Sequence, residues 1–372
     1  MAAGDHLTPL LLQPERAPRL TLADWDIVVR QGRRAALLAT LATRLDDRHL
    51  LKTVPERPRR HLQAAMAIAH RHAAAVAWEA GEIGRALAFG DVPFVLLKGA
   101  AYVAAHLPPA AGRLFSDIDI LVEKGRLADA EQALLVHGWV TTHHDPYDQR
   151  YYRQWMHELP PLRHVRRQTV LDLHHALLPE TARLHPDPAK VWAAAVAVEG
   201  GAGLRVLCPA DMVLHSATHL FFDGELDHGL RDLVDLDALL RHFGNDPAFW
   251  PRLLDRADEL GLGRPLHYAL RYTTQRLATP VAAAVVRSAA RAAPTPLAAP
   301  LMDALFSRAL APDHPTCATP LTPLARFLLY LRAHYLRMPL HLLLPHLLRK
   351  AWMRRHPERP PARPLNGELR EE

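Results

Sequence analysis

The chain has 372 residues, of which 49% are hydrophobic and 23% are charged, so it is long enough for more than one core. The 45 basic and 39 acidic residues leave a formal net charge of +6, an excess too small to indicate nucleic acid as a specific partner. Cys208 and Cys317 lack the spacing of a disulfide framework or a zinc site, which favours a cytoplasmic setting. The N-terminus is unlike a secretory signal, and no apolar run is long enough to span a membrane.

The first 90 residues predict an N-terminal helical region. Residues 22–90 are rich in alanine, leucine and arginine, and Leu62, Met66 and Ala69 recur at helical spacing. Gly90 then supplies a helix stop signal. We therefore place the end of this region, residues 1–90, at that glycine.

Strands and helices alternate after Gly90. The segment "DVPFVLLKGAAY", residues 91–102, predicts a buried strand that turns into a helix, and "RLFSDIDILV", residues 113–122, predicts a second strand. Residues 124–138 predict a helix, and residues 159–178 predict two short strands around a basic turn. This order indicates an α+β core over residues 91–205, in which helices pack on a small mixed sheet.

The pattern is helical again over residues 206–356. Residues 281–322, rich in alanine and proline, predict a segment that is partly a linker. The tail, residues 357–372, is polar and broken by proline, which predicts disorder.

Two carboxylates lie one residue apart in the strand predicted at 113–122. Asp117 and Asp119 share one face of such a strand, where like charges are destabilising unless a cation or a solvated sheet edge compensates them. The later strand places Asp172 and His174 together on one of its own faces. If the two strands are neighbours, the three carboxylates converge on one or two Mg²⁺ or Mn²⁺ ions that hold a nucleoside triphosphate. The alternative is an exposed edge with solvated aspartates.

The turn after the first predicted strand carries groups suited to phosphate. Gly99 allows the backbone to approach a phosphate closely, and the helix that follows directs amide N–H groups toward it. Lys98 and Arg113 can neutralise phosphate charge. Both long side chains are explained equally well by packing along the surface or by pairing with nearby acids.

The segment "LLKGAAYVAAHLPPAAGRLFSDIDILV", followed by "LDLHHAL", resembles the uncharacterised nucleotidyltransferase family of the DNA polymerase β-like superfamily. The shared features are a Leu-Lys-Gly turn, an arginine before an Asp-x-Asp strand, and a later Asp-x-His strand. The segment "HSATHLFFDGELDHGLRDLVDLDALL" resembles the helical part of that family. The resemblance implies a polymerase β-like core at 91–205 that transfers a nucleoside monophosphate from a nucleoside triphosphate, ATP among the candidates, to an unidentified acceptor, with Mg²⁺ or Mn²⁺ and release of pyrophosphate.

The same resemblance implies roles for individual residues. Asp117, Asp119 and Asp172 become metal ligands and catalytic residues, with Asp172 as the candidate general base. The candidates for binding the nucleotide are Lys98, Gly99, Arg113, Ser116 and His174.

One departure from the superfamily favours a second function, and a third function stays open independently of it. Gly99 is followed by Ala100, where the superfamily usually has a serine or glycine, so a hydroxyl contact to the triphosphate is missing. A catalytically silent module that binds a nucleotide or a partner on the same fold is therefore the second hypothesis. A hydrolase that uses the same acids on a phosphodiester is the third.

Histidines outside these motifs favour a structural interpretation. His215 and His219 have the i, i+4 spacing of a zinc-binding helix, but no glutamate follows His215 as in a metalloprotease motif. We expect both to line the cleft or the core. His174 and His175 are adjacent, so on a strand they face opposite ways and cannot serve one site.

Two features of the helical half have alternative explanations. Arg231 and Asp235 have the i, i+4 spacing of a surface ion pair, whereas the family resemblance favours a place in the cleft. Residues 326–356 are basic and amphipathic, which permits a peripheral membrane contact, although packing on the protein's own core is the commoner explanation.

Overall fold

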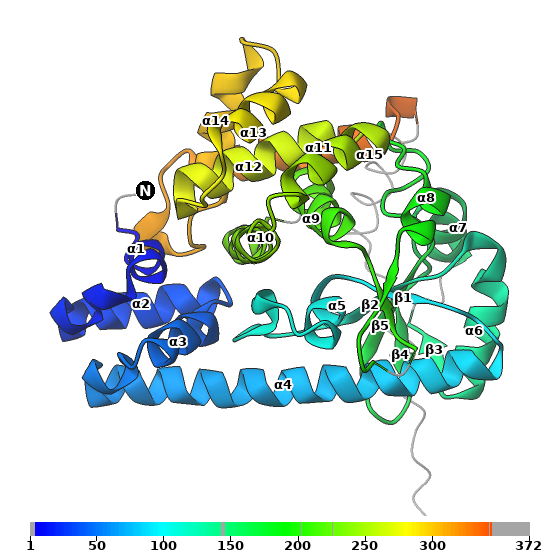
Figure 1. Cartoon of the computed structure of the whole chain (residues 1–372), viewed down its shortest axis with the longest axis horizontal. Coiled ribbons are helices and arrows are strands. Elements are labelled where there is room, and N and C mark those ends of the chain that lie inside the picture. Colours follow the sequence, from blue (N-terminus) through cyan, green and yellow to red (C-terminus); the bar gives the residue numbers. More distant parts are fainter. Residues whose placement is uncertain (1–3, 143–145, 202, 225, 342, 344–372) are drawn as a thin grey trace, which may run out of the picture.

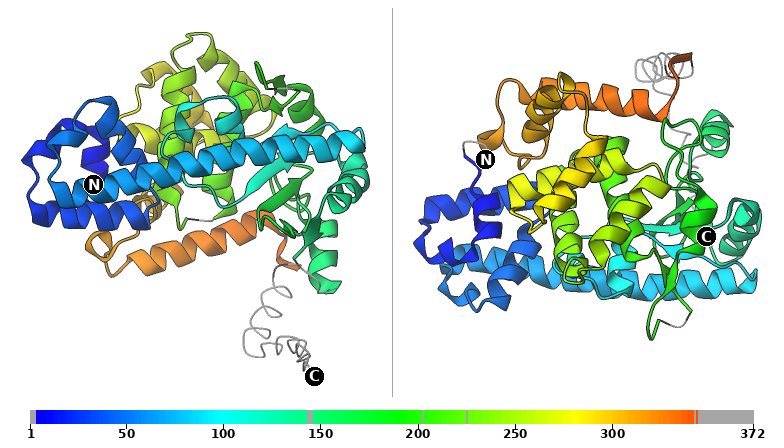
Figure 2. Two further views of the ribbon diagram at one scale, coloured as in Figure 1. Left: turned by 90° about the horizontal axis from the view of Figure 1, so that it is seen from below. Right: turned by 45° about the horizontal axis from the view of Figure 1, so that its top comes forward.

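The computed structural model describes residues 4–142, 146–201, 203–224, 226–341 and 343. The long helix α4 (Glu56–Phe89) runs along one side of the molecule, beneath the N-terminal helices at one end and the sheet at the other (Figure 1). The C-terminal helices lie on the opposite side of the sheet region from α4, and the turned views agree (Figure 2). The tail predicted to be disordered, residues 357–372, lies outside the described residues.

The N-terminal region is helical, as the sequence predicts. Three helices precede α4, namely α1 (Leu7–Leu12), α2 (Leu22–Arg34) and α3 (Leu38–Asp47). The short 3₁₀ turns are η1 (Pro14–Arg19) and η2 (Leu51–Thr53). Helix α2 begins at a capping box in which Thr21 and Asp24 each accept a hydrogen bond from the other's backbone amide.

Seven short strands form one mixed sheet in the order β3-β4-β5-β2-β1-β7-β6. Strand β5 runs parallel to β2, and β7 runs parallel to β1, whereas the other neighbouring pairs are antiparallel. The predicted α+β class, with helices packed on a small mixed sheet, is therefore confirmed. The strands are β1 (Val95–Leu96), β2 (Ile118–Leu121), β3 (Trp139–Thr141), β4 (Leu162–His164), β5 (Val170–His174), β6 (Val196–Ala197) and β7 (Arg205–Val206).

The register between β2 and β5 is fixed by their apolar side chains. Ile118 pairs with Leu171 and Ile120 pairs with Leu173, and all four side chains are fully buried. A slip of one residue would drive carboxylates into the apolar core, which makes this register strongly preferred. Asp119 consequently lies directly opposite Asp172.

Helices pack on the sheet in the central region. The helix predicted after the first strand is α5 (Lys98–Ala104), and the one predicted at 124–138 is α6 (Leu127–Val136), followed by Gly138 with a φ of 89°. Helix α4 packs against both. The remaining elements here are α7 (Pro146–Trp155), α8 (Pro188–Ala193), η3 (Pro108–Ala110) and η4 (Lys124–Arg126).

The C-terminal half is helical beyond what the sequence predicts. Residues 281–322 are not a linker, because they form two helices that pack against α12 and α15. Alanine has a high helix propensity, and Phe306 from this segment is buried among aromatic rings. The helices are α9 (Pro209–Thr218), its π-helical continuation η5 (His219–Asp223), α10 (Gly229–Phe243), α11 (Phe249–Glu259), α12 (Gly263–Leu277), α13 (Ala283–Ala289), α14 (Ala298–Ala309) and α15 (Thr322–Arg337), with 3₁₀ turns η6 (Ala290–Ala292) and η7 (Pro315–Cys317).

Within the described ranges, none of the helices combines the length and the apolar character needed to cross a membrane. Helix α15 buries Ala325, Leu329 and Ala333 against the protein, so the part of residues 326–356 that the structure describes does pack on the core. Most of the remainder of that segment lies outside the described residues.

Candidate active site

A cavity of about 460 Å³ lies between the sheet and the helices α9 and α10. Residues that are far apart in the sequence line it, from Ala36 before α3 to Arg337 at the end of α15. The structure brings every site residue predicted from the sequence to this one cavity, while the role of each stays a prediction. These residues are Lys98, Gly99, Arg113, Ser116, Asp117, Asp119, Asp172 and His174.

The three predicted carboxylates reach the cavity from two neighbouring strands. Asp119 on β2 and Asp172 on β5 are register partners. Asp117 immediately precedes the first residue of β2 and follows a bend at Ser116, so it lies just outside the strand. Ser116 Oγ donates a hydrogen bond of 2.9 Å to Asp117 Oδ1, so the serine holds this carboxylate directly.

Asp119 is the carboxylate that the protein keeps ionised. It is buried, and its Oδ1 accepts hydrogen bonds from Lys98 Nζ at 2.7 Å and from His174 Nε2 at 3.0 Å. Burial alone would raise the pKa of Asp119, but Lys98 and His174 together hold it well below its usual range. Burial alone would lower the pKa of His174, but its hydrogen bond to Asp119 and the charge of Glu158 raise it overall.

The pKa of Asp172 is shifted in the opposite direction. Burial raises its pKa to about 7, and the neighbouring charges of Asp119 and Glu158 add to the effect. Among the described residues, nothing forms a hydrogen bond with its buried Oδ1. A buried carboxylate oxygen without a partner, facing a second carboxylate across the register, is a donor set that suits a hard divalent cation.

Lys98 adopts an unusual backbone conformation at the start of α5. Its φ is 43°, in the left-handed region, which for a residue other than glycine is strained by about 1 kcal/mol or more. This conformation accompanies the contact of Nζ with Asp119. Burial alone would lower the pKa of Lys98, but Asp119 raises it, so the ammonium group stays charged.

Gly99 is required by packing. A Cβ atom at this position would lie 2.8 Å from Cδ1 of Phe115 and 3.3 Å from Nε of Arg113. Helix α5 has only seven residues, which leaves little macrodipole at its N-terminus. The predicted role of Gly99 in binding phosphate therefore stays untested, and the glycine has a second explanation.

Charged residues of α10 form the wall opposite the sheet. Arg113 pairs with Asp235 of α10, and its guanidinium lies 5.8 Å from the ring centre of Tyr102. Arg231 donates from Nε and Nη2 to Asp232 Oδ1, at 2.9 and 2.8 Å. The interpretation of Arg231 and Asp235 as a surface ion pair is wrong, because both residues line the cavity and each pairs with a different residue.

The helix histidines lie where the sequence places them, in the cleft and the core. His219 lines the cavity, and His215 lies behind it, 5% exposed. Burial, followed by the charge of Lys98, lowers the pKa of His215 to about 3, so this imidazole is neutral. The helix changes from α to π between them, and such a change is frequent at functional sites.

The family model described as "Uncharacterised nucleotidyltransferase" matches residues 21–278. The chain belongs to this family. The match includes every residue that lines the cavity except Arg337. Membership supports a general function in nucleotidyl transfer. No curated protein and no solved structure matches the chain significantly.

Among the residues that line this cavity, the sequence did not single out His157 and Glu158. They lie between α7 and β4, and Glu158 forms an isolated antiparallel bridge with His174 of β5. A single bridge leaves no periodic pattern in the sequence. The only signal was two residues with metal-ligating side chains, histidine and glutamate, just before a strand.

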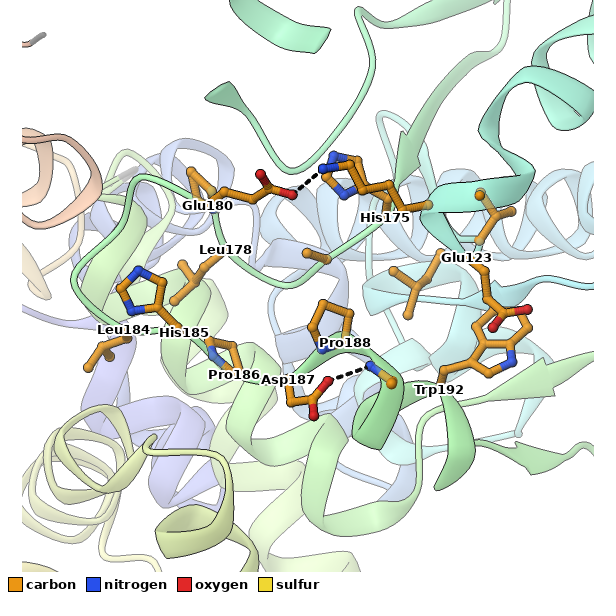
Figure 3. A pocket seen from close by; sticks show the side chains of 17 residues that line it. Glu123, His175, Leu178, Glu180, Leu184, His185, Pro186, Asp187, Pro188 and Trp192 are labelled. Carbon is orange, nitrogen blue, oxygen red and sulfur yellow. Dashed lines mark hydrogen bonds and ion pairs between the residues drawn. The ribbon is translucent and has the colours of Figure 1, made fainter. Parts of the chain in front are cut away.

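A second cavity, about 510 Å³, lies beyond the ends of β2 and β5 (Figure 3). His175 lines it, whereas His174 lines the first cavity, which confirms that the adjacent histidines face opposite ways. Two of its acids have other partners, since Glu180 pairs with Lys124 and Asp187 accepts a hydrogen bond from the Ala189 amide. The carboxylate pair lies in the first cavity, which is therefore the candidate active site.

Proposed function

We propose that the protein transfers a nucleoside monophosphate from a nucleoside triphosphate to an acceptor, releasing pyrophosphate, with Mg²⁺ or Mn²⁺ held by Asp117, Asp119 and Asp172. The observation that carries this proposal is the placement of Asp119 and Asp172 as register partners in one cavity, beside Lys98. Family membership supports the reaction class. The metal, the donor and the acceptor belong to the proposal.

The residues present fit a divalent ion. Asp172 Oδ1 is buried without a hydrogen-bond partner among the described residues, and Lys98 shows that the position beside Asp119 Oδ1 accommodates positive charge. When bound, Mg²⁺ or Mn²⁺ neutralises triphosphate charge and orients the reacting oxygens. Asp117 is partly exposed and lines the cavity, so the three carboxylates are accessible from the cavity.

In the proposed reaction an oxygen of the acceptor attacks the α-phosphorus of the nucleotide. A new P–O bond forms, the bond from the α-phosphorus to the bridging oxygen breaks, and pyrophosphate leaves. Asp172, with its pKa near 7, accepts the proton of the acceptor hydroxyl. Lys98 and Arg113 supply positive charge for the phosphates.

The wall formed by α10 suits a role in choosing the acceptor. Arg231, Asp232 and Asp235 face the carboxylate pair from this helix and offer groups of both charges. Because Asp232 and Asp235 each hold an arginine, the wall is ordered before any substrate arrives.

A nucleotide screen by mass spectrometry tests the transfer. Purified protein is incubated with Mg²⁺, each of the four nucleoside triphosphates and a pool of candidate acceptors, and pyrophosphate is measured in parallel. We expect pyrophosphate and a monophosphate adduct in the wild type, both reduced by at least about a hundredfold in Asp117→Ala and Asp119→Ala. Equal adduct formation in all three proteins would remove these acids from the mechanism.

A silent nucleotide-binding module remains the second candidate function because of the turn after Gly99. Ala100 is 2% exposed and offers no polar group to the cavity. The same experiment separates the two functions. Binding of a nucleotide with Mg²⁺ but without pyrophosphate or adduct, across the acceptor pool, favours the silent module.

A further inference from the structure

Three side chains at one edge of the cavity form a second group of potential metal ligands. His157, Glu158 and His174 each offer one ligand atom, and these atoms all lie within 4.8 Å of one another. The rings of His157 and His174 have centroids 5.2 Å apart. Two imidazoles and one carboxylate therefore meet at a single point of the fold.

The backbone fixes this group before any ion binds. The amide of His175 donates to the carbonyl oxygen of His157 at 2.8 Å, and the amide of Leu159 donates to the carbonyl oxygen of Leu173 at 2.9 Å. Glu158 and His174 are bridge partners between these bonds. The segment that carries two of the ligands is thus tied to the strand that carries the third, which lowers the entropic cost of assembling a site.

His174 Nε2 faces two carboxylate oxygens at once. Asp119 Oδ1 lies 3.0 Å from it and Glu158 Oε2 lies 3.5 Å from it. A metal ion that replaced the proton on this nitrogen would lie close to both oxygens. Ligands that bind zinc tetrahedrally at about 2.1 Å lie about 3.4 Å apart, so the separation of His174 and Glu158 already matches such a site.

The donor set differs from that of the three aspartates. Mg²⁺ prefers oxygen ligands, whereas imidazole nitrogen favours Zn²⁺, Co²⁺ and related ions. We propose that His157, Glu158 and His174 form a binding site for a transition-metal ion of the Zn²⁺ or Co²⁺ type, adjacent to the site of Asp117, Asp119 and Asp172 but with its own set of ligands. This site stands on its own geometry and does not depend on the proposed transfer reaction.

Cobalt is the probe for this site, because Co²⁺ gives visible absorption bands that report its coordination. The full chain is used without a histidine tag and after removal of metals with EDTA, since its 24 histidines already provide weak surface sites. We expect one tightly bound Co²⁺ per chain by equilibrium dialysis, and displacement of that ion by Zn²⁺. We expect Mg²⁺ to displace it at least about a hundredfold less effectively.

Two variants and one matched control locate the ion. His157→Ala and Glu158→Gln should each weaken Co²⁺ binding by at least about tenfold and change its absorption spectrum. His185→Ala should do neither, because His185 is exposed and lines the other cavity (Figure 3). Glu158→Gln preserves the side-chain volume, so it tests the site even if His157→Ala fails to fold.

Asp117→Asn separates this inference from the proposed reaction. It should leave Co²⁺ binding within about threefold of wild type, because Asp117 is not part of the group, while it impairs Mg²⁺-dependent nucleotide binding. Absence of a tight Co²⁺ site, or Co²⁺ binding that His157→Ala and Glu158→Gln leave unchanged, would overturn the inference. Loss of Co²⁺ binding in Asp117→Asn would place the ion on the aspartates and would overturn it as well.

Discussion

Asp119 and Asp172 lie directly opposite each other on β2 and β5, yet their carboxyl groups have pKa values on opposite sides of the usual range. Lys98 and His174 lower the pKa of Asp119, whereas burial and the adjacent charge raise that of Asp172 to about 7. Two neighbouring carboxyl groups cannot ionise independently. The environment therefore makes Asp119 a stable anion, whereas Asp172 titrates near pH 7.

Asp172→Asn should change how stability depends on pH. Because the pKa of Asp172 rises from 3.8 to about 7 on folding, the folded protein binds more protons than the unfolded chain in that interval. The contribution of Asp172 to the free energy of unfolding therefore falls as pH rises through this window. The variant has no carboxyl group to titrate at this position. Its free energy of unfolding minus that of the wild type should therefore rise with pH across this window, by at most about 4 kcal/mol.

Thermal melts in EDTA from pH 4 to pH 8 measure this difference. At each pH the melting temperature of the wild type is subtracted from that of the variant. This difference removes the effect of all groups that titrate alike in both proteins. A difference in melting temperature that stays constant with pH would show that Asp172 titrates normally.

Lys98→Met should make the protein more responsive to Mg²⁺. The variant leaves the buried Asp119 without its ammonium partner, which destabilises the metal-free protein by about 3 kcal/mol or more. Mg²⁺ should then raise the melting temperature of the variant more than that of the wild type, because it replaces the missing charge. Lys124→Met is the control, since Lys124 pairs with Glu180 on the surface and contributes little. Equal Mg²⁺ shifts in wild type and Lys98→Met would argue against a metal beside Asp119.

Gly99→Ala should destabilise the protein through a clash with Phe115. The new Cβ would lie 2.8 Å from the ring, so the ring or the helix start must move, at a cost of about 1–3 kcal/mol. Phe115→Leu in the same chain should recover part of that loss. Denaturant melts of the two single variants and the double variant measure the coupling, and strictly additive effects would rule out the clash as the cause.

The central part of the site could be predicted from the sequence because its residues carry local signals. Asp117 and Asp119 interrupt an apolar strand, and Asp172 and His174 repeat the same spacing. Apolar neighbours that alternate with these acids determine which face they occupy, and that alternation also selects the register. Even here the sequence placed Asp117 within the strand, whereas the strand begins one residue later.

The contacts that complete the cavity could not be predicted, because they depend on tertiary packing. Arg113 pairs with Asp235 on a helix far along the chain, and i, i+4 spacing pointed to Arg231 instead. Glu158 reaches the site through one isolated bridge. The prolines of residues 281–322 indicate a partial linker, whereas its alanines favour helix. In the structure the segment forms α13 and α14.

The pair Arg113–Asp235 should couple the sheet region to α10. Arg113→Met leaves the buried Asp235 without its ion-pair partner, and Asp235→Asn does the same to the largely buried guanidinium of Arg113. The losses of stability in the two single variants should add up to about 1–3 kcal/mol more than the loss in the double variant. This difference is the coupling energy of the pair. A double-mutant cycle by urea unfolding provides the value. A coupling energy near zero would mean that the ion pair does not hold α10 in place.

The most direct test of the proposed function is Mg²⁺-dependent stabilisation by nucleotides. Melting temperatures are recorded for the wild type and Asp117→Asn with ATP, GTP, CTP and UTP, each with Mg²⁺ and with EDTA. Asp117 suits this control because it lies outside the buried network of Asp119. We predict that at least one nucleotide raises the melting temperature of the wild type only when Mg²⁺ is present, and that Asp117→Asn loses most of this shift. No Mg²⁺-dependent shift with any of the four nucleotides in the wild type would contradict the account.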